Sequence, residues 1–301
     1  PTHPSPSRGE GKGGGEKGFT LTELMIAIVI GMIVISATYA TYISQQRSFT
    51  AQDQVAEMNS TSKIALDMIA NDIRETGFGV PDDLTTVQRT VGCSGINGFT
   101  QKINLTDNTA SEDQITILGG FRLVGNIASA VSSGSTTLTL TDTSELNTTD
   151  RAYISIAGLS FAIVTAIDSG TNTLTLQTGL DRDYPAGVPV YLIENVTYQI
   201  VNGELQKVRR LNGGGCATNP DTDTIAENIE DLQFALVDIA PADGVTDRIR
   251  VNLLATTARP DPNFQGQGNP PATIENRNLA ATNDSLRRRW WQMEVDLRNP
   301  I

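Results

Sequence analysis

The stretch from Leu24 to Gln46 contains no charged residue over 23 consecutive positions. About 20 apolar residues are enough for an α-helix to cross the hydrocarbon core of a bilayer. The first half, Leu24 to Ile35, is almost continuously aliphatic, and the second half carries Tyr39 and Tyr42, which suit a membrane–water interface. We therefore predict a membrane-spanning helix. The alternative is a helix buried in the core of a soluble domain.

The helical pattern continues beyond this apolar stretch. From Val55 to Ile73, apolar and small side chains recur at three- and four-residue steps, and charged residues occupy the other faces. No proline or glycine interrupts Met32 to Thr76, and Gly77 and Pro81 are typical stop signals. The sequence predicts one helix from about Phe19 to Thr76, with its first half in lipid and its second half packed on a domain.

The segment before the helix, Pro1 to Gly18, does not resemble a Sec-type signal peptide, because it is polar and has no apolar segment of its own. Its basic residues are Arg8, Lys12 and Lys17. A short basic flank before a membrane span favours a cytoplasmic N-terminus. The bulk of the chain is then expected outside the cytoplasm.

After Gly79 the apolar residues alternate with polar ones, which is typical of half-buried strands. The Asn202-Gly203 pair predicts a two-residue hairpin turn. Residues Arg259 to Asp284 are rich in Pro, Asn and Gln and predict a long loop. The predicted strands are Gln114–Leu118, Thr136–Leu140, Ala152–Ile156, Phe161–Ile167, Thr173–Leu176, Val188–Ile193, Thr197–Val201, Asp231–Asp238, Asp247–Thr256 and Arg289–Arg298.

In the last strand, alternate residues beginning at Trp291 are expected to face the core, and those beginning at Trp290 the other side. Trp290 is either an exposed binding aromatic or a cover for the Pro-rich loop. The resulting fold class is α+β: a long N-terminal helix on a largely antiparallel β-sheet domain. We expect a leader at 1–18, the helix at 19–77 and a β-rich domain at 78–301, with a β-rich insertion at 113–194.

Charge and residue usage exclude several functions. The formal net charge is −12 and no basic patch stands out in the main body, so nucleic acid is not an expected partner. The only histidine is His3, so a chain without its leader has no Ser-His-Asp or Cys-His catalysis. Asp181-Arg182-Asp183 and Asp221-Thr222-Asp223 lack EF-hand spacing and are interpreted as acidic turns. We expect no enzyme activity, cofactor or metal.

The two cysteines, Cys93 and Cys216, are far apart and form no CxxC motif. In an oxidising compartment a disulfide is the simplest interpretation. The alternative is two separately buried thiols.

The sequence Gly18-Phe19-Thr20-Leu21-Thr22-Glu23-Leu24, followed by the aliphatic stretch, resembles the N-terminal segment of the type IV pilin class. The resemblance implies that a prepilin peptidase cuts between Gly18 and Phe19 and methylates the new amino terminus at Phe19. It also implies that the Glu23 carboxylate meets the terminal amine of a neighbouring subunit in a filament.

Electrostatics is consistent with that role for Glu23. A lone carboxylate in hydrocarbon costs about 2.5–3.5 kcal/mol at mid-membrane and less near the edge. Cleavage creates an ammonium one helical turn away, and a neighbouring subunit's ammonium then offsets the desolvation of the carboxylate. The alternative is a glutamate whose side chain reaches out to the membrane interface.

Three further segments resemble PilW-like minor pilins: Ser62–Gly79, Glu227–Phe234 and Arg287–Pro300. The resemblance implies a structural minor pilin that helps to start or cap a type IV pilus. A J-like pseudopilin of type II secretion shares this plan and is the main alternative. A third possibility is a tip adhesin whose insertion, Asp113 to Glu194, binds a surface or ligand.

The implied partners are other major and minor pilins, the prepilin peptidase, the inner-membrane assembly platform and membrane lipid. The implied location is the inner membrane, crossed once, with a cytoplasmic leader and a periplasmic domain. After assembly the location is a cell-surface pilus.

Major pilins are usually shorter and carry a helix-bending proline in the membrane segment, whereas Phe19 to Val80 contains none.

Overall fold

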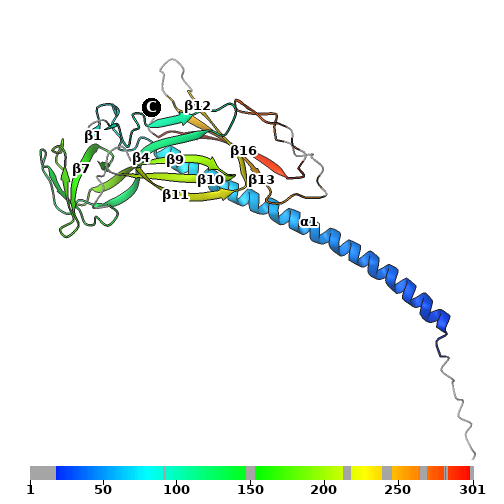
Figure 1. The fold of residues 1–301 in the computed structure, drawn as a ribbon. Helices are drawn as coiled ribbons and strands as arrows, with labels where there is room; N and C mark the ends of the chain where they lie inside the picture. The colour runs from blue at the N-terminus through cyan, green and yellow to red at the C-terminus, as the bar shows by residue number, and fades with distance from the viewer. Residues whose placement is uncertain are drawn as a thin grey trace, which may run out of the picture. The chain divides into compact units, whose positions relative to one another are not determined.

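The computed structural model describes residues 18–90, 93–146, 153–212, 218–238, 246–262, 264, 270–280, 282 and 284–298. In this part of the chain, one long helix, α1 (Leu21–Glu75), precedes a set of antiparallel strands (Figure 1). The chain divides into two compact units, residues 1–52 and 53–301, so the second unit holds the end of α1 and all the strands. The α+β class predicted from the sequence is therefore confirmed.

The observed bounds of helix α1, Leu21–Glu75, are within two residues of the predicted bounds, Phe19–Thr76. Within the second unit its buried residues recur at three- and four-residue steps, as expected for a helix with one face on a core. Gly77 follows the helix with φ of +79°, and its N–H donates to the Leu118 carbonyl at 2.8 Å. This residue thus ends the helix and ties it to the sheet. The buried positions are Met58, Ser62, Ala65, Leu66, Ile69, Ala70, Asp72 and Ile73.

The larger sheet has nine strands among the described residues. They are β3 (Ile103–Thr106), β4 (Gln114–Asn126), β5 (Thr137–Thr139), β6 (Tyr153–Ile156), β7 (Ser160–Asp168), β8 (Thr173–Leu176), β9 (Pro189–Val201), β10 (Glu204–Asn212) and β11 (Thr218–Glu227). The main order is β11-β10-β9-β6-β7-β8-β5, and β4 pairs with both β3 and β9. Strand β11 therefore lies at one edge.

A second sheet has three strands, in the order β12-β13-β16. They are β12 (Ile229–Val237), β13 (Arg248–Thr256) and β16 (Arg288–Asp296). Two small two-stranded sheets complete the described fold. They are formed by β1 (Gln88–Thr90) with β2 (Cys93–Ser94), and by β14 (Thr273–Ile274) with β15 (Arg277–Asn278).

The hairpin predicted at Asn202-Gly203 is confirmed. It joins β9 to β10, with Val201 opposite Glu204 in the register. Asn202 and Gly203 have φ of +54° and +80°. Positive φ at both central residues is the requirement of a type I′ turn, which Asn-Gly meets at low cost.

The two strands predicted at Val188–Ile193 and Thr197–Val201 form one continuous strand, β9, so the predicted break between them is wrong. The apparent break was the polar pair Glu194-Asn195, which is buried rather than in a turn. Glu194 accepts from Arg122 at 2.6 Å, and Asn195 accepts from Asn97 at 2.8 Å. Burial of these polar groups is tolerated because each has a partner.

Other strand predictions differ in extent. Strand β4 continues to Asn126, well beyond the predicted end at Leu118. The predicted loop Arg259–Asp284 contains the short β14–β15 hairpin, whose Ile274 is 1% exposed. The strand β11 was not predicted, because its sequence TNPDTDTIAE is rich in turn residues.

The core of the second unit has distinct clusters. One cluster joins the buried face of α1 to both sheets, through residues such as Ile69, Tyr198 and Phe234. Another lies within residues 124–192 and includes Ile154 and Leu174. Strands β4 and β9 contribute to both clusters and so connect them.

The predicted faces of the last strand are confirmed. Trp291 and Met293 pack against the first cluster, and Val295 is 1% exposed within it. Trp290 faces the other side and is 40% exposed, opposite Leu254 in the register.

Candidate functional site

The peptide bond between Gly18 and Phe19 lies just before α1, in a segment without helix or strand. The Phe19 residue is 90% exposed. A Cβ added at Gly18 would meet no atom within 4 Å, and the φ of Gly18 lies outside the left-handed range. Among the described residues, neither packing nor backbone conformation therefore requires a glycine at this position.

The first turn of α1 is capped by Thr20 and Glu23. The Glu23 Oε2 atom accepts from the Thr20 backbone N–H at 2.9 Å and from the Thr20 hydroxyl at 2.8 Å. In return the Thr20 Oγ1 atom accepts from the Glu23 backbone N–H at 3.2 Å. This reciprocal pair is a capping box, which satisfies two backbone donors that the start of a helix leaves free.

The capping box was missed in the sequence, although Thr20-x-x-Glu23 before an apolar stretch is its signature. It gives Glu23 a structural role besides the role implied by the resemblance. Only Oε2 takes part in these bonds, so within the described residues Oε1 is open to a further donor. The negative charge also lies at the positive end of the helix dipole, where it is stabilising.

By length and composition, α1 is a helix that can cross a membrane, and no other helix among the described residues passes that test. Its aliphatic side chains from Leu24 to Ile35 are exposed. Three hydroxyl groups in the same stretch donate to the carbonyl four residues earlier: Ser36 to Met32, Thr38 to Val34 and Thr41 to Ala37. These hydroxyls are satisfied within the helix, which lowers the cost of placing them in lipid.

The other end of α1 is held in the β-rich unit by a buried charge. Asp72 is 9% exposed, and its Oδ2 accepts from the Tyr198 hydroxyl at 2.5 Å and from Lys207 Nζ at 2.6 Å. Burial, together with the Asp72 carboxylate, raises the pKa of the Tyr198 hydroxyl, which therefore keeps its proton as a donor. The contact fixes α1 on strands β9 and β10.

The two cysteines and the acidic segment at Asp221–Asp223 were also singled out in the sequence. Cys216 lies outside the described residues, as does the side chain of Cys93, so their disulfide stays a prediction. The acidic turn predicted at Asp221-Thr222-Asp223 is wrong, because these residues lie within strand β11. Asp221 and Asp223 both accept from Arg209 there, at 2.8 and 2.9 Å. Within the described residues no group of three His, Cys, Asp or Glu side chains has an arrangement that would hold a metal ion.

Comparison with known families identifies the N-terminal segment. Residues 14–39 match the family described as the prokaryotic N-terminal methylation motif. No curated protein and no solved structure shows significant similarity to the chain. The matched residues include Gly18, Phe19 and Glu23, so the family match and the geometry coincide on one segment.

The motif implies processing by a prepilin peptidase and assembly with other pilins. With the apolar helix, it fits membrane anchoring through α1 and a periplasmic β-rich domain. It also indicates a structural rather than an enzymatic role. The segment thus supports a type IV pilin-like or pseudopilin protein.

Proposed function

We propose that this chain is a minor pilin of a type IV pilus, cleaved between Gly18 and Phe19 and N-methylated on Phe19. The support is an exposed, non-helical bond beside a glycine that nothing in the described chain requires. A peptidase that must approach the backbone closely supplies the missing reason for that glycine. A residue with a Cβ would obstruct this approach.

The geometry of Glu23 supports the proposed role in assembly. Its Oε2 atom is held by Thr20, which fixes the carboxylate within one helical turn of the new terminus at Phe19. Its Oε1 atom remains open to the ammonium of a neighbouring subunit. Because an aliphatic stretch follows from Leu24 to Ile35, the ammonium and the carboxylate are each unfavourable alone in lipid and favourable as a pair. The pair therefore sets the register between packed helices.

The assignment to the minor subunits rests on resemblance and on the fold. The three segments that resemble PilW-like minor pilins belong to the end of α1, to β12 and to β16. They meet in one hydrophobic cluster, through residues such as Ile69, Phe234 and Val295. Residues 124–192, which lack that resemblance, form a cluster of their own. We infer a shared pilin-type framework that carries a variable insertion and helps to start or cap the filament.

Filament fractionation tests the proposal. Tagged wild-type protein should be recovered from surface filaments sheared off cells that make pili. Glu23→Ala should enter the membrane but be depleted from the sheared filaments, because it removes the partner of the terminal ammonium.

Glu23→Gln is the matched control, since its amide oxygen retains the bonds from Thr20 without the charge. We expect it to be depleted as well. That result would show that assembly needs the charge that pairs with the ammonium, and not only the capping bonds to Thr20. Wild-type levels of Glu23→Ala in the filaments would contradict the assigned role. Wild-type protein that never reaches the surface filaments would instead favour the pseudopilin.

A further inference from the structure

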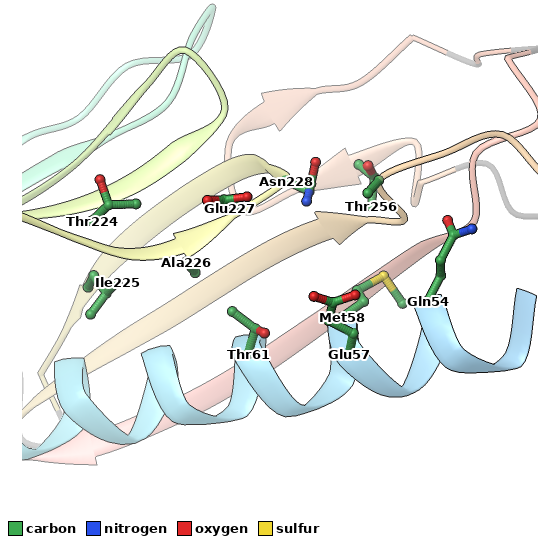
Figure 2. A pocket seen from close by; sticks show the side chains of 11 residues that line it. Gln54, Glu57, Met58, Thr61, Thr224, Ile225, Ala226, Glu227, Asn228 and Thr256 are labelled. Atoms are coloured by element: carbon green, nitrogen blue, oxygen red, sulfur yellow. The ribbon is translucent and has the colours of Figure 1, made fainter. Parts of the chain in front are cut away.

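A groove of about 370 Å³ lies between residues 54–61 of α1 and the edge strand β11. Figure 2 shows the side chains of Gln54, Glu57, Met58 and Thr61 rising from α1 toward the strands. The opposite side is formed by residues 224–228, at the corner between β11 and β12. All of these residues belong to the second compact unit.

The backbone of β11 has a free edge that reaches this groove at Thr224. The two-residue turn makes Val201 and Glu204 a pair that exchanges both backbone hydrogen bonds. From Glu204 onward, alternate residues of β10 therefore form their backbone hydrogen bonds with β9. The residues between them form their backbone hydrogen bonds with β11. Lys207 is one of the latter, and it lies opposite Asp223.

The neighbours of Asp223 in β11 therefore direct their backbone groups away from β10. These neighbours are Thr222 and Thr224, and in the described residues no backbone hydrogen bond outside the β10 pairing reaches either of them. Pro220 falls in the same outward set, which is where an edge strand tolerates a residue without an N–H. The outward N–H and C=O groups form a row that can pair with a further strand.

The side chains of the groove define what such a strand must carry. Met58, Ile225 and Ala226 give the groove an apolar part, and Glu57 and Glu227 are exposed carboxylates beside it. In the part of the chain that the structure describes, neither carboxylate has an ion-pair partner. A strand with aliphatic and basic side chains would cover the apolar part and neutralise both carboxylates.

We propose that an extended segment of another protein subunit, with Lys or Arg beside aliphatic residues, pairs with β11 and fills this groove. Backbone pairing supplies affinity, and the alternate side chains supply selectivity. This docking surface goes beyond the proposed function, since it depends on neither cleavage at Gly18 nor pairing by Glu23.

Peptide binding to the detergent-solubilised full chain tests the proposal. The probes are two short fluorescent peptides, one of alternating Lys and Val and one of alternating Glu and Val. Fluorescence anisotropy should show binding of the Lys/Val peptide that weakens with added salt, and no binding of the Glu/Val peptide. Failure of the Lys/Val peptide to bind, or equal binding of both peptides, would overturn the proposal.

A pair of substitutions tests the backbone edge. Thr224→Pro and Thr224→Val both lose the hydrogen bond from the Thr224 hydroxyl to Glu204, which is 3.1 Å long in the wild-type protein, but only proline removes the outward N–H. We expect Thr224→Pro to bind the Lys/Val peptide about fivefold more weakly than Thr224→Val, the effect of one backbone hydrogen bond. Equal binding by the two variants would exclude strand pairing at this edge.

A second pair tests the charge of the groove. Glu57→Lys and Asp67→Lys change the net charge equally, and both residues are exposed on α1, but only Glu57 lines the groove. We expect Glu57→Lys to weaken binding about fivefold and Asp67→Lys to leave it nearly unchanged, since exposed charges act locally. Equal weakening would mean non-specific attraction to an acidic protein. The comparison of Glu57→Lys with Asp67→Lys tests binding in the groove even if Thr224→Pro fails to fold.

Discussion

Removing the ammonium of Lys207 should destabilise the β-rich unit by about 3 kcal/mol, because it leaves the Asp72 carboxylate buried without a countercharge. Lys207 Nζ lies 2.6 Å from Asp72 Oδ2, and the side chains of Lys207 and Asp72 are 18% and 13% exposed. Breaking a fully buried pair from one side costs about 3–5 kcal/mol, and the residual exposure places this pair at the lower end. Tyr198 still donates to the carboxylate, but it carries no charge.

Lys207→Met is the appropriate change, because it keeps most of the side-chain volume that packs beside the helix. Urea unfolding followed by tryptophan fluorescence measures the free energy of unfolding. The double variant Asp72→Asn/Lys207→Met removes both charges and keeps an acceptor for Tyr198, so it should recover most of the loss. A loss below about 1 kcal/mol for Lys207→Met, the range of an exposed pair, would refute this reasoning.

Two further predictions concern the fold. Gly79 has φ of +69°, and a Cβ there would lie 2.0 Å from Ser155 Oγ, so Gly79→Ala should lower the free energy of unfolding by more than about 1 kcal/mol. Gly98→Ala, at φ of +89° with no atom within 4 Å, should cost less, and calorimetry compares the two. Hydrogen bonding from Arg288 lowers the pKa of Asp284 to about 2, so Asp284 stabilises the fold above its unfolded pKa of about 3.9. The melting-temperature difference between wild type and Asp284→Asn should persist at neutral pH and vanish as pH falls through about 2.

The helix and the hairpin were predictable because their determinants are local. The buried positions of α1 follow a helical period that is visible in the sequence between Met58 and Ile73. The turn at Asn202-Gly203 depends on the conformational freedom of just two residues. No distant partner is needed to recognise either element.

The continuity of β9 was not predictable in the same way. Glu194 and Asn195 look like a polar break, and their burial is understood only from their partners, Arg122 and Asn97. These partners lie 72 and 98 residues away in the chain. Polar residues inside a strand therefore mislead a local pattern whenever distant side chains satisfy them.

The same distinction between local and distant determinants applies to the candidate site and to the groove. Gly18, Phe19 and Glu23 could be identified from a short motif, and the capping box was readable from Thr20 and Glu23 alone. The groove beside β11 could not be predicted, because it joins α1 to a strand more than 150 residues later in the chain. Its edge strand also carries a turn-like sequence, which hid it from a search for alternating apolar residues.

Mass spectrometry of the N-terminal peptide tests the central claim most directly. The protein is recovered from the membranes of cells that contain a prepilin peptidase and is digested for sequencing. We expect a peptide that begins at Phe19 and carries one methyl group on its terminal amine. An intact bond between Gly18 and Phe19, or a terminus created elsewhere in the segment, would contradict the assignment as a processed pilin-like subunit.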